Sequence, residues 1–552
     1  MDGPALVQGD GRRGGLLRTL LLGLAFWIAC LGGRIMAGAT SSSFGAYEDE
    51  PAHLVTGLMI RDFLQDGELD TSRQFAEEYY AHSPKVAFGQ WPPVLHGALG
   101  LWTYLFGHSR FSLVAMCSLV TALAALLTRA LLRQCGAQDP LPTIAGWLFL
   151  ALPLVQEYAG LIMTEGPLAL TCGFAVLGLA RLLERDDWVG AMQFAAGAIA
   201  ALLIKGLALA LALLPLAAIL LAWRWERLRS KRLWTAALLI GVFTAPWYLA
   251  FYRTAIETWS GGSSPTWGYA AYALGFYPRA LWELGGSGFL ALVLVGFAAG
   301  VMGAEKRTRW CVYLAWTPAL FGFLATIPSS AEARHLILAA PVLACAATLG
   351  AWFLAGKFTS QRRLLLTLTI LMLAYVPMGM RFPGKRYRGF EEVALRCLSD
   401  PELAAGPFLV ASDAAGEGML VSEFLMRRSA VQSPYVLRGS KLLGSGNWLG
   451  HGYEPRFENA QALEEFLISL PVSVLVIDGS TKSEHWFGHM EQLKEMVRRQ
   501  PSRWREVARV DVERDGVLHA GAMQLFELRG HAQLPHTPIT FRLARGADQR
   551  DH

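Results

Sequence analysis

The stretch LLRTLLLGLAFWIACLGGRIMAG, residues 16–38, is a long apolar segment, and the acidic run Glu48-Asp49-Glu50 follows it closely. A segment of this length and composition crosses a bilayer as a single helix. Ionisable groups near a membrane boundary cost free energy unless they face water or a partner. The acidic run therefore indicates either a solvated surface or a working site, and the rest of the sequence has to decide between the two.

Apolar runs of similar length recur up to residue 381. The chain of 552 residues is 53% hydrophobic and only 17% charged, whereas about one quarter of an ordinary soluble domain is charged. The sequence therefore predicts a polytopic α-helical membrane protein, and a net charge of +5 spread over short loops does not indicate nucleic-acid binding. Windows of about 20 apolar residues predict roughly eleven spans, near residues 16–38, 110–132, 141–158, 166–183, 188–204, 207–223, 233–252, 287–303, 310–327, 335–354 and 364–381.

The loops between the predicted spans alternate in charge. One set is basic, and it includes the run from Arg224 to Arg232 and the group Lys306, Arg307 and Arg309. Because basic loops stay on the cytoplasmic side, we expect this set and the N-terminus to be cytoplasmic. An odd number of spans then places everything after about Arg381 on the outer face.

Two long loops belong to the opposite, outer face. In the first, near residues 39–107, the apolar spacing predicts short helices around 54–63 and 74–81, and Pro92-Pro93 opens an apolar helix that reaches Phe106. The second, from Tyr252 to Gly286, is rich in Trp and Tyr. Anchoring at the membrane interface is the expected role of these rings, including Tyr277.

From Gly384 onward the composition is that of a soluble protein. Strands are predicted at 407–412, 472–478, 504–512 and 523–528, and helices at 417–427, 460–470 and 485–499. This alternation predicts a transmembrane domain over residues 1–383, a C-terminal extracytoplasmic α/β domain over 384–530 and a disordered tail over 531–552. No two of the seven cysteines have CxxC spacing, so the sequence supports neither a zinc knuckle nor a disulfide framework.

Charged and polar residues gather at four points on the predicted outer face. A lone Glu, Lys or Arg at the end of a span is more often a snorkelling anchor than a catalyst. Four such groups on one face, however, are suited to surround a charged head group. They are Asp49 and Glu50 with His53, which lies one helical turn beyond Asp49 if this stretch is helical; Glu165; Lys205; and Arg334 with His335.

The sequence Asp49-Glu50-Pro51-Ala52-His53 resembles the Asp-Glu motif in the first outer loop of GT-C glycosyltransferases. The resemblance is to the branch that includes dolichyl-phosphate-mannose protein mannosyltransferases and bacterial aminoarabinose–lipid A transferases. Glu165, His335 and the pair Gln90-Trp91 stand where that branch has Asp, Tyr and an acidic-basic pair. Further similar segments follow in order: Gln90-Trp91-Pro92-Pro93 with Leu105-Phe106-Gly107, Met163-Thr164-Glu165, Lys205-Gly206 with Pro215, Ala245-Pro246-Trp247-Tyr248, and Arg334-His335 with Pro341.

The resemblance implies an inverting transferase that moves a sugar from a polyprenyl-phosphate donor to a hydroxyl group of a lipid, a glycan or a protein. It implies that Asp49 is the general base and that Glu50 and His53 orient the base or the acceptor. Lys205 and Arg334, with His335, would bind the donor phosphate. Glu165 would either hold a divalent metal ion or position the base.

Two other classes of protein stay open at this point. A transporter or lipid flippase also carries charges within the membrane, although usually on broken helices in internal repeats, which we do not find. A non-catalytic membrane scaffold would keep the fold with altered site residues. For the transferase, the expected location is the bacterial inner membrane, as a multi-pass protein in contact with membrane lipids.

Overall fold

The computed structural model describes residues 8–531 except 69–70, 88, 252–264, 304–305, 328–330, 357, 379–383, 385, 428–433, 446–452, 471, 482–486 and 515–516. The expected tail over 531–552 therefore falls, after His531, outside the described residues. The contacts divide the chain into two units. The transmembrane unit comprises Met1–Met36, Gly89–Val94 and Ala115–Pro383, and the mixed unit comprises Ala37–Phe88, Leu95–Val114 and Gly384–His552.

The transmembrane unit is built from helices, and a continuous or broken helix covers most of each predicted span. Six helical segments among the described residues are long and apolar enough to cross a membrane, namely Gly14–Met36, Arg110–Gln134, Glu165–Arg185, Lys231–Ala250, Trp267–Met302 and Ala333–Leu354. The predicted helical membrane class is therefore confirmed. The helices are α1 (Gln8–Met36), α5 (Arg110–Gln134, which starts in the mixed unit), α6 (Leu141–Ala151), α7 (Pro153–Tyr158), α8 (Glu165–Arg185), α9 (Trp188–Leu202), η3 (Gly206–Ala212), α10 (Leu214–Ala222), η4 (Trp225–Arg229), α11 (Lys231–Ala250), α13 (Trp267–Met302), α14 (Arg307–Thr326), η5 (Ala333–Ala339), α15 (Ala340–Leu354), α16 (Ser360–Tyr375) and η6 (Val376–Met378).

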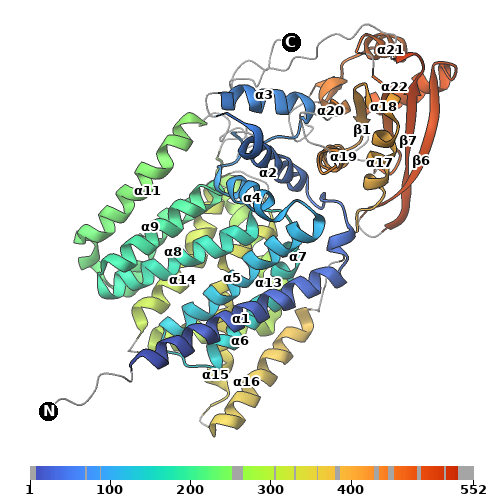
Figure 1. Ribbon diagram of the computed structural model, residues 1–552. Coiled ribbons are helices and arrows are strands. Elements are labelled where there is room, and N and C mark those ends of the chain that lie inside the picture. The colour runs from blue at the N-terminus through green and yellow to red at the C-terminus, as the bar shows by residue number, and fades with distance from the viewer. Residues whose placement is uncertain are drawn as a thin grey trace. The chain divides into compact units, whose positions relative to one another are not determined.

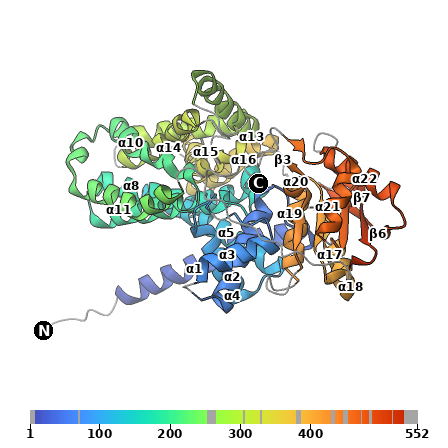
Figure 2. The same ribbon diagram turned by 90° about the horizontal axis from the view of Figure 1, so that it is seen from above.

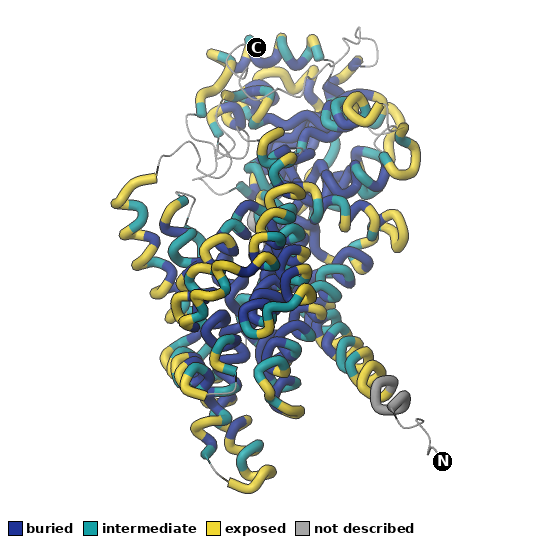
Figure 3. The backbone as a smooth tube through the Cα atoms, turned by 90° about the vertical axis from the view of Figure 1, so that its left-hand side faces the viewer, coloured by how far each residue is buried: buried dark blue, intermediate teal, exposed yellow. Residues whose placement is uncertain are grey.

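Small residues set the spacing between the central helices. A Cβ atom at Gly178 would lie 2.4 Å from the backbone nitrogen of Phe194, so only glycine lets α8 and α9 pack as closely as they do (Figure 1). Buried residues line the interior of this helical layer, and exposed residues cover its outward helix surfaces (Figure 3). The exposed side chains of α1 include Leu16, Leu20 and Ile28, as expected for a surface in contact with lipid.

The aromatic segment predicted as a loop from Tyr252 to Gly286 is helical from Trp267 onward, so the loop prediction is wrong for that part. Its first residues, 252–264, lie outside the described residues. Thr266 caps the helix, because its side chain accepts a hydrogen bond from the backbone nitrogen of Tyr269 at 3.1 Å. Gly286, with φ of +67°, joins two helical halves of α13 at a kink. Aromatic residues have only modest helix propensity, and the cap and tertiary packing override it here.

The mixed unit contains the α/β region expected from the sequence. Its five-stranded sheet has the order β2-β1-β5-β7-β6, with β1, β2 and β5 parallel and β7 antiparallel to both β5 and β6. Figure 2 shows β6 and β7 side by side. The sequence missed the short strand β2 and the helix α17. The strands are β1 (Phe408–Ala411), β2 (Val436–Arg438), β3 (Gly444–Ser445), β4 (Glu454–Pro455), β5 (Val474–Asp478), β6 (Trp504–Arg514) and β7 (Val517–Leu528), and the helices are α17 (Phe390–Ser399), α18 (Pro401–Ala404), α19 (Ala414–Leu425), α20 (Gly439–Leu442), α21 (Ala460–Ser469) and α22 (Gly488–Arg499).

The first outer loop folds together with this α/β region. Its expected helices are present as α2 (Asp49–Asp66), α3 (Ser72–His82) and α4 (Val94–Phe106), after the short η1 (Ala39–Ser41). Ser43 donates its backbone N–H to the carbonyl of Tyr387 at 2.8 Å. Arg110 forms ion pairs of 2.6 Å with both Glu391 and Glu423. Segments more than 250 residues apart in sequence are therefore in direct contact, as the pair Arg110–Glu391 shows.

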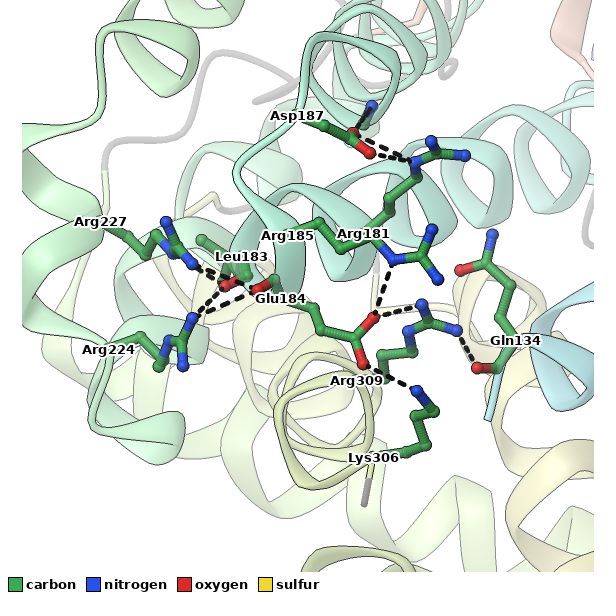
Figure 4. Close-up of polar contacts among 11 residues, drawn as sticks. Gln134, Arg181, Leu183, Glu184, Arg185, Asp187, Arg224, Arg227, Lys306 and Arg309 are labelled. Carbon is green, nitrogen blue, oxygen red and sulfur yellow. Dashed lines mark hydrogen bonds and ion pairs between the residues drawn. The ribbon is translucent and has the colours of Figure 1, made fainter. Parts of the chain in front are cut away.

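The C-terminal end of α8 carries a charged cluster in the transmembrane unit (Figure 4). Glu184 accepts a hydrogen bond from Arg309 and lies 3.4 Å from the ammonium of Lys306. Arg224 and Arg227 donate to the last carbonyl oxygens of α8. Those carbonyls have no partner within the helix, so the arginines satisfy them. Two basic loops that the sequence assigns to one side thus meet at one end of α8.

Candidate functional site

The acidic run forms the first turn of α2, where Glu48 is the N-cap residue and Asp49 the first helical residue. Negative charge at this position is favoured by the helix dipole. The Glu50 side chain is fully buried, and its Oε2 accepts a hydrogen bond from the backbone nitrogen of Ala46 at 3.0 Å. Glu50 therefore fixes the turn that leads into α2, and His53 follows Asp49 by one helical turn.

His53 is paired with a histidine that the sequence analysis did not select. Its Nδ1 lies 2.9 Å from Nε2 of His96 on α4, and both side chains are buried. One of the two nitrogens must accept the hydrogen bond, so at least one ring is neutral. A single histidine within the otherwise apolar α4 was the only signal in the sequence for this contact.

Lys85 is a second residue that the sequence analysis missed. It follows α3, is partly buried, and donates to the carbonyl oxygen of Ala414 at 3.3 Å. Burial and the neighbouring Arg438 lower the pKa of Lys85 to about 7, against the opposing effect of Glu48 and Asp49. The start of α2 is thus a group of interacting charges and not a fully solvated acidic surface.

A separate group of charges lies in the transmembrane unit around Glu165, the first residue of α8. Glu165 is buried, and its Oε1 lies 3.6 Å from the Lys205 ammonium and 3.6 Å from Nε of Arg334. Lys205 stands between α9 and η3, and Arg334 lies in η5. Arg334 also contacts Glu332 at 2.7 Å. Buried charges persist only when they are paired, and here one carboxylate oxygen serves two cations.

His335 lies beside these cations and contacts an aromatic residue of α13. Its Nδ1 is 3.1 Å from the hydroxyl of Tyr277, and both side chains are buried. The interpretation of Tyr277 as an interfacial anchor is therefore wrong, because a buried and hydrogen-bonded ring does not face the membrane interface. Because this segment contains many aromatic residues, the sequence could not distinguish Tyr277, which contacts His335, from the others.

The structure thus brings the selected residues together in two sets. Asp49, Glu50 and His53 belong to the mixed unit, and Glu165 lies with Lys205, Arg334 and His335 in the transmembrane unit. Within the described ranges, no group of three or more His, Cys, Asp or Glu residues is arranged to hold a metal ion. The contacts that place Glu165 are with cations.

No protein family model matches the chain, and no characterised protein matches its sequence. The structure is nevertheless similar, over nearly its whole length, to ArnT from Cupriavidus metallidurans bound to undecaprenyl phosphate. The TM-score is 0.58 at 12% identity, and the match covers 95% of this chain and 99% of that chain. The fold is that of the GT-C glycosyltransferases. The fold expected from the sequence resemblance is therefore confirmed.

Two further solved structures share this GT-C fold. The same ArnT in the apo state has a TM-score of 0.58 at 12% identity, over 96% of this chain and 100% of that chain. The archaeal oligosaccharyltransferase AglB from Archaeoglobus fulgidus, in complex with an inhibitory peptide and a dolichol-phosphate, has a TM-score of 0.52 at 12% identity. That match covers 83% of this chain and 69% of AglB.

Proposed function

We propose that this protein is an inverting glycosyltransferase that moves a sugar from a polyprenyl-phosphate donor to an acceptor hydroxyl on the outer face of the membrane. The GT-C fold supports the class of reaction, and structures that share the fold hold undecaprenyl phosphate or dolichol-phosphate. The observation that carries the proposal is the buried cluster in which Lys205 and Arg334 share the carboxylate of Glu165.

This cluster is suited to bind a phosphate. Both contacts to Glu165 are 3.6 Å long, beyond the usual length of a hydrogen bond. A phosphate carries more charge and more acceptor oxygens than one carboxylate, so it competes well for both cations. Arg334 offers a planar fork of donors and Lys205 a point charge. The same cations then stabilise the charge that gathers on the phosphate as it leaves.

Asp49 is the proposed general base. It takes the proton of the acceptor hydroxyl while the acceptor oxygen forms a bond to the anomeric carbon of the sugar. The bond from that carbon to the phosphate oxygen breaks, and the electron pair leaves with the polyprenyl phosphate. Glu50 and His53 hold the first turn of α2, through the contacts to Ala46 and His96. Glu165 then positions both phosphate-binding cations.

The orientation belongs to the same proposal. The basic loops that meet at the C-terminal end of α8 would be cytoplasmic. The N-terminal end of α8, with Glu165, would then be at the outer side. At 1.5 Å per residue, the 21 residues of α8 span roughly 30 Å, which matches a bilayer core. The α/β region after Gly384 would be extracytoplasmic, in the bacterial inner membrane.

The proposal is tested by mass spectrometry of envelope glycolipids and glycoproteins from cells with the protein, without it, and with Asp49→Asn. We expect at least one species to lose a single sugar residue in both the deletion and the Asp49→Asn strain. The same glycan profile in all three strains would contradict a transferase. A change in the deletion strain alone would instead favour a transporter or a scaffold, because neither needs a base at Asp49.

A further inference from the structure

We infer that Lys85 is a positioning residue for the acidic first turn of α2, and that the C-terminal α/β region holds it there. The inference rests on the proposed role of Asp49 and adds a residue outside every motif that carries the family resemblance. It also gives the α/β region a part in the reaction.

The α/β region contacts the segment around Lys85 directly. The ammonium of Lys85 lies 3.3 Å from the carbonyl oxygen of Ala414, the first residue of α19. Arg438, the last residue of β2, donates to the carbonyl of Pro84 at 3.2 Å. Two consecutive residues of the outer loop are thus bound by two elements of the sheet region.

These contacts come from the carboxyl edge of the parallel strands. Arg438 ends β2, and α19 starts just after β1, which ends at Ala411. In α/β sheets this edge is where ligands usually bind. Here Pro84 contacts the last residue of β2 and Lys85 the first residue of α19, so this edge supports the outer loop.

The opposite side of the segment is fixed to α2. The backbone nitrogen of Ala87 donates to the hydroxyl of Thr56 at 2.9 Å. A Cβ atom at Gly418 would lie 2.7 Å from Cγ of Pro51 and 2.9 Å from Cε of Lys85. The start of α2 and the Lys85 stem therefore lie against one spot on α19, which only glycine leaves open.

The charges around Lys85 leave the α2 carboxylates as its main counter-charges. Arg438 is paired with the buried Glu417 at 2.9 Å, and Asp413, which precedes Ala414, is paired with Arg514 at 2.7 Å. Glu48 and Asp49 are the other acids that interact with Lys85. Adjacent carboxylates repel each other, and a nearby ammonium offsets this repulsion. The Lys85 ammonium is therefore placed to attract the first turn of α2 and to hold Asp49 in position.

The coupling is measured without knowledge of the substrates. Full-length protein in nanodiscs is labelled with trace acetic anhydride between pH 5 and 10, and the labelling of each lysine is followed by peptide mass spectrometry. We expect Lys85 to titrate well below an ordinary lysine, and lower still in Glu48→Gln and Asp49→Asn, because each removes a counter-charge. The labelling of Lys231, an exposed lysine of α11, should not respond. A Lys85 titration that ignores both substitutions would overturn the inference.

The role in transfer is tested with Lys85→Met and Lys85→Arg, in the cells used for the glycan profile. Met fills the space of the lysine stem without its charge, and Arg restores the charge. We expect roughly 10-fold less product with Met and a partial recovery with Arg. Wild-type product from Lys85→Met would refute the positioning role while leaving the transferase proposal intact. A wild-type strain with no sugar product would refute the transferase, and the labelling experiment would still decide whether Lys85 is coupled to α2.

Discussion

The ammonium of Lys205 lies 3.6 Å from the carboxylate of Glu165, a residue 40 positions earlier in the chain. The same oxygen is 3.6 Å from Arg334. Three segments of the chain thus place two cations and one anion in a buried position at the start of α8. Glu332 adds a second carboxylate, 2.7 Å from Arg334, so a lipid phosphate must compete with two carboxylates for the two cations, and its attraction to them is greater where water is excluded.

Removing either cation should weaken the binding of a lipid phosphate. We expect Lys205→Gln and Arg334→Gln to bind undecaprenyl phosphate in nanodiscs more weakly than the wild type. Arg334→Lys should recover only part of the affinity, because the forked contact is lost. Arg185→Gln, at the exposed far end of α8, is the matched control and should bind normally. Normal affinity in both Gln variants would make these residues membrane anchors.

Glu165→Gln should have the opposite effect on binding. Glutamine removes the negative charge that Lys205 and Arg334 share. The folded fraction of the variant should therefore bind a lipid phosphate more tightly than the wild type. The same change removes the carboxylate that Lys205 contacts, while Arg334 keeps Glu332, and it should cost about 3–5 kcal/mol of stability. Glu165→Asp, which retains the charge, is the control for folding. If Glu165 were a metal ligand, phosphate binding would fall in Glu165→Gln and would also fall on treatment with EDTA.

Asp49→Asn should abolish most of the transfer without disturbing the fold. Asparagine keeps the shape of the side chain but cannot take a proton, so we expect turnover to fall roughly 10²–10⁴-fold. Asp66→Asn, at the exposed C-terminal end of the same helix, should leave turnover unchanged. Unfolding temperature and phosphate binding are measured in parallel. Near-normal transfer by a folded Asp49→Asn protein would assign the base to another residue.

Much of this architecture follows from local features of the sequence. Apolar length predicts the membrane helices, and Pro92-Pro93 and the spacing of leucines predict the outer helices, because each depends on neighbouring residues alone. The gathering of Glu165, Lys205 and Arg334 was expected from their common outer face, but the direct contact of Glu165 with both cations was not. His96, Lys85 and Tyr277 could not be found in this way, because their contacts join segments that are distant in sequence.

In the α/β region, too, the elements with a clear local sequence pattern were predicted and those that depend on distant contacts were not. β5, in which four buried apolar residues precede Asp478, was predicted, whereas β2, a strand of only three residues, was not. A strand this short has too little periodicity to recognise, and its pairing with β1 decides its conformation. The aromatic segment before Gly286 was assigned to a loop from its Trp and Tyr content. That content indicates a preference for the membrane interface but says little about the backbone conformation.

The orientation is tested with single cysteines at exposed positions, in a protein that lacks reactive native thiols. Gln138→Cys lies between α5 and α6, and Ser399→Cys lies at the end of α17. We expect an impermeant maleimide applied to intact spheroplasts to label Ser399→Cys alone, and to label Gln138→Cys only after permeabilisation. Labelling of both cysteines in intact spheroplasts would refute the orientation and with it the outer placement of the transfer reaction.

The last prediction concerns stability and pH at Lys85. Its pKa is lowered to about 7 in the folded protein, mainly by burial, whereas an unfolded lysine titrates near 10.4. Between these values the unfolded chain binds more protons than the folded one, so the contribution of Lys85 to stability rises with pH. Below pH 7 the charge is present in both states, and the folded protein bears the full desolvation penalty.

We therefore expect Lys85→Met to unfold at a higher temperature than the wild type at pH 6, and this advantage to shrink steadily toward pH 10. A residue that lowers stability and yet supports transfer is one kept for function. An advantage that does not change with pH would show that packing, and not charge, separates the two proteins.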